Sequence, residues 1–112
     1  MKSKRANPTY EEPSEEMARE SIQAALRSVP RDIAKWRLIF LPTSQIKRGH
    51  DIELEERHEE LPDAWLEAPE TIPPIVIRQT GKNQYRIVDG LHRFEAAAQV
   101  GIKKLWAVEV AY

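Results

Sequence analysis

The sequence predicts a small α+β domain, and three neighbouring segments near the C-terminus carry this prediction. Residues 75–79 and 85–89 are rich in β-branched and aromatic side chains, and a turn-rich stretch separates them, as in a β-hairpin. A helix starting at Gly90 follows, because apolar residues recur there at helical spacing, and Gly101 stands where a helix commonly ends. A last strand is expected over 105–110. A hairpin, a helix and a strand in this order are typical of an α+β domain.

The first part of the chain carries fewer signals. Residues 1–12 show no periodicity, so we expect a flexible tail. An N-terminal helix is predicted over 13–30, because Ser14 precedes two glutamates that suit a first helical turn, and Pro30 ends the apolar stripe. A strand is expected over 36–41, closed by a proline. We therefore divide the chain into a tail, the N-terminal helix and a domain over 36–112.

The segment between the first strand and the hairpin is harder to assign. Residues 43–46 are typical of a turn or a single helical turn, and residues 51–61 of an acidic helix. Pro62 is expected to end or kink that helix, because proline has no amide hydrogen to donate. A short apolar patch, 64–66, follows it.

Composition excludes several classes of protein. The 112 residues are enough for one domain, and the 41% hydrophobic and 31% charged residues lie in the globular range. Cysteine is absent, which excludes disulfides, cysteine-based zinc sites and thiol catalysis. The chain has neither an apolar run of the ~18–20 residues that span a bilayer nor a secretory signal. We expect a cytoplasmic protein with no membrane partner.

Charge is distributed unevenly behind a net charge of −1. Residues 31–50 sum to +4, residues 51–70 to −8 and residues 71–112 to +3. A duplex-binding module is usually basic overall, so the acidic block would have to face away from any phosphate backbone. We interpret that block as a solvated helix face. The three histidines lack the spacing of a zinc motif, and no metal site is predicted.

The strongest candidate site is the junction between the second hairpin strand and its helix. A helix N-terminus presents unpaired amides and a partial positive charge, which suits phosphate. Gly90 lets a ligand approach the backbone, and His92 and Arg93 add donors in the first turn. The candidate phosphate-binding residues are Asp89, Gly90, Leu91 (through its backbone), His92 and Arg93. The alternative is structural: Asp89 caps the helix and Arg93 pairs with a nearby acid.

These residues resemble a known family. The order Pro73-Pro74, hairpin, Asp-Gly-Leu-His-Arg-Phe-Glu-Ala over 89–96, glycine and strand is similar to the ParB/sulfiredoxin superfamily, most strongly over 73–101. The resemblance implies a small ParB/sulfiredoxin-like fold whose turn at 90–93 holds the phosphates of ATP, ADP or CTP with Mg²⁺. ParB proteins carry Gly-Glu-Arg-Arg at this turn and bind CTP, whereas Leu91 and His92 stand here.

Two other branches of the superfamily indicate which reactions this chain could catalyse. Sulfiredoxins have their catalytic cysteine at the position of Leu91, so sulfinic acid reduction is excluded. Free serine kinases have a junction closer to this one, and their catalytic acid corresponds to Asp51, a candidate general base that could instead cap a helix. A sulfiredoxin lysine that contacts nucleotide corresponds to Arg57. That arginine either binds nucleotide or pairs with Glu53 or Glu60.

Three functions remain open from the sequence. The first is a nucleotide-binding domain, with ATPase or phosphotransfer activity left undecided. The second is a nucleic-acid-associated protein, nuclease-like or a plasmid or phage regulator, in which basic segments 31–50 and 78–104 form one face. The third is a non-enzymatic module that docks a protein partner through the N-terminal helix or the 51–70 block.

Overall fold

A five-stranded mixed sheet organises the computed structural model, which describes residues 10–27, 35–47 and 60–111. The expected α+β class is confirmed. The helices are α1 (Glu15–Ala25), α2 (Glu60–Glu67) and α3 (Leu91–Gln99), with short 3₁₀ turns at Thr43–Gln45 and Pro69–Thr71. The strands are β1 (Lys35–Pro42), β2 (Ile46–Lys47), β3 (Ile75–Gly81), β4 (Gln84–Asp89) and β5 (Lys104–Ala111).

The strand order is β1-β5-β3-β4-β2. The last strand, β5, lies between β1, to which it is antiparallel, and β3, to which it is parallel. The predicted hairpin is formed by β3 and β4, but its strands are longer than expected, so only Lys82 and Asn83 form the turn. Asn83 adopts φ +56°, a left-handed conformation that asparagine tolerates better than most residues.

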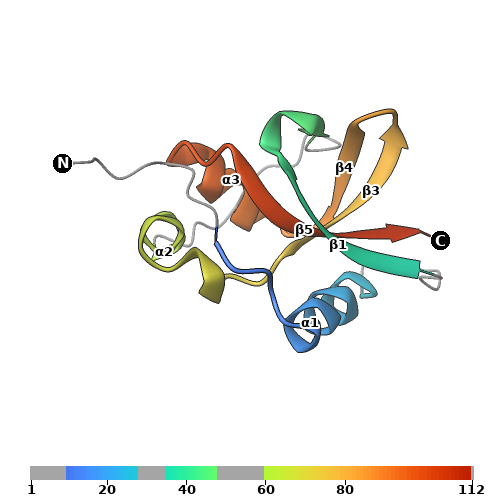
Figure 1. Cartoon of the computed structure of the whole chain (residues 1–112), viewed down its shortest axis with the longest axis horizontal. Helices are drawn as coiled ribbons and strands as arrows, with labels where there is room; N and C mark the ends of the chain where they lie inside the picture. The colour runs from blue at the N-terminus through green and yellow to red at the C-terminus, as the bar shows by residue number, and fades with distance from the viewer. Residues whose placement is uncertain (1–9, 28–34, 48–59, 112) are drawn as a thin grey trace.

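Helices cover both faces of the sheet (Figure 1), with α1 on one face and α2 and α3 on the other. Successive side chains of a strand point to opposite faces, so Ile75 and Ile77 join the larger core while Val76 joins the smaller one. The larger core contains Trp65, Phe94 and Leu105 among other buried residues. The smaller core consists of Ala18, Ile22, Ala25, Val76, Val108 and Val110.

The N-terminal helix, predicted over 13–30, begins at Glu15. The Ser14 hydroxyl accepts a hydrogen bond from the Met17 amide at 3.1 Å, which caps α1. The structure describes α1 only as far as Arg27, so the predicted stop at Pro30 lies outside the described residues. Tyr10, at the end of the range expected to be a tail, is anchored instead. Its hydroxyl accepts from the Trp106 amide at 2.8 Å, and its carbonyl accepts from the Trp106 indole at 3.0 Å.

The structure differs from the sequence prediction at Pro62. Helix α2 includes Pro62, so the helix does not end there, and the kink that the sequence left as the alternative stays a prediction. Pro62 is the third residue of the described helix, and near a helix start a proline is tolerated because its missing amide hydrogen would have no carbonyl partner within the helix. The preceding acidic segment, 51–59, lies outside the described residues. Trp65 of α2, which the sequence placed in a short apolar patch, is 2% exposed and belongs to the larger core.

The end of α3 agrees with the sequence. Gly101 has φ +82°, and the amides of Gly101 and Ile102 donate to the carbonyls of Ala98 and Ala97. The chain then enters β5, so one short turn links the helix to the middle of the sheet. None of the helices in the described ranges is long and apolar enough to cross a membrane.

Candidate anion-binding site at the β4–α3 junction

Gly90 joins β4 to α3 in a conformation that requires glycine. Its φ is +102°, and a Cβ atom there would lie 2.8 Å from Cγ2 of Ile75, closer than real contacts allow. The backbone at Gly90 therefore packs directly against the first residue of β3. The structure thus gives Gly90 a conformational role, and its predicted role in ligand approach stays a prediction.

The N-cap residue of α3 is Gly90, which makes no side-chain cap hydrogen bond. Gly90 has no side chain to supply one, and no hydrogen bond joins the Asp89 carboxylate to a first-turn amide within the described residues. The first intrahelical bond runs from the Phe94 amide to the Gly90 carbonyl at 2.9 Å, so the amides of residues 91–93 precede the helical ladder. The structural alternative, in which Asp89 caps the helix, is not what the structure shows.

Arg93 folds back over this junction. Its Nη2 atom lies 2.9 Å from the position of a Cβ at Gly90 and 3.6 Å from Oδ2 of Asp89. The Arg93 side chain is 20% exposed, and its Nε atom is buried without a hydrogen-bond partner. Burial lowers the pKa of Arg93 and the Asp89 charge opposes this shift, but an arginine stays cationic at neutral pH.

The structural alternative for this junction was that Arg93 pairs with a nearby acid. Asp89 is that acid, although the two side chains are not within hydrogen-bond distance. A distance of 3.6 Å is within ion-pair range and longer than a hydrogen bond. The Asp89 side chain is also 30% exposed, so water screens the pair. An anion with several acceptor oxygens could therefore compete for the guanidinium.

Trp65 positions the first turn of α3. Its indole Nε1 atom donates to the Arg93 carbonyl oxygen at 3.0 Å. On the sequence, Trp65 is only one of three tryptophans in apolar surroundings, and its partner lies 28 positions away. No local pattern could have identified this contact.

The five predicted residues of the junction, Asp89 to Arg93, come together at one half-buried place. Asp51 and Arg57 lie outside the described residues, so the general base and the additional nucleotide contact remain predictions. Within the described ranges, no group of three or more His, Asp and Glu side chains is arranged to hold a metal ion.

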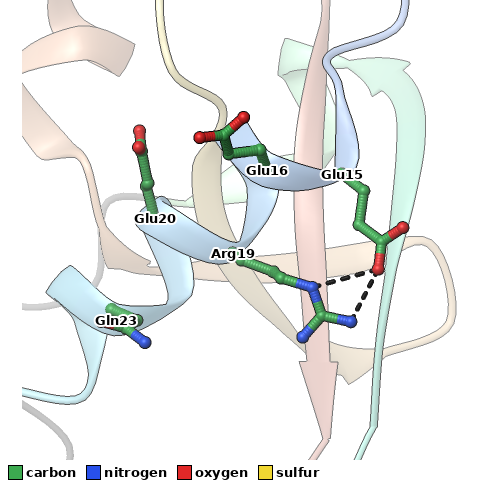
Figure 2. A pocket seen from close by; sticks show the side chains of 5 residues that line it. All are labelled: Glu15, Glu16, Arg19, Glu20 and Gln23. Atoms are coloured by element: carbon green, nitrogen blue, oxygen red, sulfur yellow. Dashed lines mark hydrogen bonds and ion pairs between the residues drawn. The ribbon is translucent and has the colours of Figure 1, made fainter.

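A hollow lies on the outer surface of α1 (Figure 2). It is lined by Glu15, Glu16, Arg19, Glu20 and Gln23. Arg19 is bound to Glu15 at 2.6 Å, which leaves a surrounding of carboxylates. Such a surface repels phosphate, so the β4–α3 junction is the better anion site of the two.

The fold and junction together define a ParB-like domain. Residues 30–111 match the model of the ParB N-terminal domain, and the chain belongs to this family. No curated protein matches the chain in sequence.

Two solved structures resemble the chain, both of C-terminally truncated chromosome-partitioning protein ParB from Caulobacter crescentus. The first, complexed with CTP-γ-S, is 24% identical with a TM-score of 0.54, and the match covers 65% of this chain and 43% of that one. The second, complexed to the centromeric parS site, is 27% identical with a TM-score of 0.46 and covers 60% and 35%. The first likeness shows a shared fold. This chain spans less than half of either ParB structure.

Proposed function

We propose that the β4–α3 junction binds the phosphates of a nucleotide. The observation that carries this proposal is that α3 begins at a glycine N-cap and that Nη2 of Arg93 lies close against this glycine. Backbone amides and a guanidinium are the donors that proteins commonly aim at phosphate oxygens. The space that a Cβ at Gly90 would fill is occupied by Ile75 and by Nη2 of Arg93, so a phosphate would approach the junction past the guanidinium.

The state of Arg93 supports an exchange of partners on binding. A phosphate would take over from the Asp89 carboxylate, whose contact at 3.6 Å is too long for a hydrogen bond. The buried Nε atom of Arg93, which has no partner, offers a further donor if the side chain turns toward the ligand. Charge-assisted bonds of this kind are worth about 1.5–3 kcal/mol each.

CTP is the first nucleotide to test, because a ParB protein of the same fold was crystallised with CTP-γ-S. ATP and ADP are the alternatives, since Leu91 and His92 replace the glutamate and arginine of the ParB turn. Leu91 offers only its backbone amide, so any base preference must come from other residues. Mg²⁺ would be held mainly by the phosphates themselves. Hydrolysis or phosphotransfer would need a catalytic group, for which Asp51 remains the candidate.

Calorimetric titration of CTP, ATP and ADP, each with Mg²⁺, tests the proposal. We expect at least one nucleotide to bind the unmodified protein. Arg93→Ala should weaken that binding by about 10- to 100-fold, because it removes one charged donor pair. Arg37→Ala is the matched control, since Arg37 pairs with Glu109 at 2.9 Å on an exposed part of the sheet.

Negligible heats for all three nucleotides, or equal affinities for Arg93→Ala and the unmodified protein, would overturn the proposal. Far-UV circular dichroism establishes that the variant is folded. Release of phosphate from the bound nucleotide, measured on Asp51→Asn beside the unmodified protein, then tests the general base. Unchanged turnover in Asp51→Asn would remove that residue from consideration.

A further inference from the structure

Trp65 of α2 makes a hydrogen bond to the backbone of α3. Its indole Nε1 atom donates to the carbonyl oxygen of Arg93 at 3.0 Å. Trp65 is 2% exposed, so water does not compete for this bond. A carbonyl oxygen has two lone pairs and can accept the indole N–H in addition to a bond within the helix. The contact therefore adds a fixed point to the residue whose guanidinium lies against Gly90.

The Trp65 ring is itself held in place. The Tyr10 ring meets it edge-on, with ring centroids 6.1 Å apart and an interplanar angle of 78°. Tyr10 is bound in turn to β5, because its hydroxyl accepts from the Trp106 amide and its carbonyl accepts from the Trp106 indole. Edge-to-face ring pairs are favourable, and close-packed interiors keep side chains in one rotamer. The segment before α1 thus helps to aim the Trp65 indole at α3.

The first turn of α3 is fixed at both ends. At its start, Gly90 packs so closely on Ile75 that a Cβ atom would lie 2.8 Å from Cγ2. Three residues later, Trp65 binds the Arg93 carbonyl. One helical turn is about 3.6 residues, so the two contacts hold the whole turn. A binding site needs its donors held within about 0.5 Å, and a guanidinium is placed no more accurately than the backbone that carries it.

We propose that Trp65 is a positioning residue for phosphate binding at the β4–α3 junction. Its indole N–H fixes the backbone of Arg93 and so keeps the guanidinium against Gly90, where the phosphate is to be met. Trp65 itself does not touch the phosphate. Without the indole N–H, the turn samples more arrangements, and binding has to offset the cost of ordering it. This inference rests on the function proposed above and adds α2 to the elements on which nucleotide affinity depends.

Trp65→Phe tests the proposal, because it keeps an aromatic ring and removes the N–H donor. Calorimetric titration should show nucleotide affinity about 2- to 10-fold weaker than in the unmodified protein, the value of one neutral hydrogen bond. Trp106→Phe is the matched control, since it removes an indole N–H that also donates to a carbonyl at 3.0 Å, that of Tyr10. The control should keep the unmodified affinity. Urea unfolding of both variants separates loss of stability from loss of affinity.

A spectroscopic measurement tests the same contact in the unmodified protein. The three tryptophans give three indole signals in a proton–nitrogen correlation spectrum. Trp36→Phe and Trp106→Phe identify the Trp65 signal by elimination, even if Trp65→Phe does not fold. On addition of the nucleotide, the Trp65 signal should move, because its acceptor belongs to the residue that binds phosphate. The Trp36 signal should stay, because Trp36 packs against the smaller core on the other face of the sheet.

The outcomes separate this inference from the proposed function. Nucleotide binding that is unchanged in Trp65→Phe, or reduced equally in Trp106→Phe, would overturn the inference and leave the proposed function standing. A Trp65 indole signal that does not move at saturating nucleotide would do the same. Absence of binding to the unmodified protein would overturn the proposed function and this inference together.

Discussion

The two faces of the sheet differ in what covers them. On one face, α2 and α3 bury large side chains such as Trp65 and Phe94 in the larger core. On the other, α1 contributes mainly Ala18, Ile22 and Ala25 and rests on valines. The first face is also joined by a hydrogen bond between helices, from Trp65 to the Arg93 carbonyl, at 3.0 Å.

This difference separates two kinds of surface. The β4–α3 junction is held by the larger core, because Gly90 packs on Ile75 and Trp65 positions the turn that contains Arg93. The face on which α1 packs carries the cations Lys47, Arg78 and Arg86, of which Lys47 is exposed and the other two are half-buried. The half-buried N-terminus of α3 suits a small anion.

The largest expected effect is on the face of the larger core. Trp65→Ala should lower the free energy of unfolding by about 3–5 kcal/mol, because it removes a fully buried indole and leaves a cavity. Urea denaturation followed by circular dichroism measures this change. Ile22→Ala, on the α1 face, should cost about 2 kcal/mol, because Ile22 is 9% exposed and packs against small side chains. An equal or greater loss in Ile22→Ala would contradict the comparison.

A smaller effect is expected at Tyr10, whose ring contacts Trp65 at a centroid distance of 6.1 Å and Phe40 at 5.8 Å. Tyr10→Phe should cost about 1 kcal/mol at neutral pH, because it leaves the Trp106 amide without its acceptor. Unfolding in urea, with matched buffers, measures the difference from the unmodified protein.

The loss of stability caused by Tyr10→Phe should also depend on pH. Burial raises the pKa of Tyr10 to about 12, from its ordinary 10.0. The unfolded chain therefore releases this proton first, so the stability that Tyr10 contributes is complete below pH 10 and falls as the pH rises toward 12. The stability gap between the unmodified protein and Tyr10→Phe should narrow over that interval. A gap that stays constant would show that the hydroxyl does not titrate as proposed.

The smallest effect is expected on the outer surface of α1. Arg19→Ala removes an ion pair with Glu15 in which both side chains are more than 60% exposed, and a contact of Arg19 with the Trp36 ring at 5.6 Å. Exposed pairs contribute little, so the expected loss is below about 1 kcal/mol. Thermal unfolding at low and high salt measures it. A loss comparable to that of Ile22→Ala would mean that α1 is held by its charged surface and not by its apolar stripe.

The secondary structure from Ile75 to Gly101 could be predicted because it depends on local chemistry. The hairpin, the glycine that opens α3 and the glycine that ends it each depend on residues within a few positions of one another. The expected helix end at Pro62 was wrong, because a proline is tolerated in the first turn of a helix and is disruptive in its interior. The choice depends on where the helix begins, which the acidic sequence around it does not define.

The sequence by itself determined the order of strands and helices after residue 75 and the helix end at Gly101, and it placed residues 89–93 together at the start of α3. Only the tertiary structure decided that β5 lies between β1 and β3, that Trp65 supports Arg93, and that Lys47, Arg78 and Arg86 stand in one row. The physical reason is the distance along the chain between the residues that interact. Backbone conformation and helix ends are governed by neighbouring residues, whereas strand pairing and side-chain contacts join residues that are far apart along the chain.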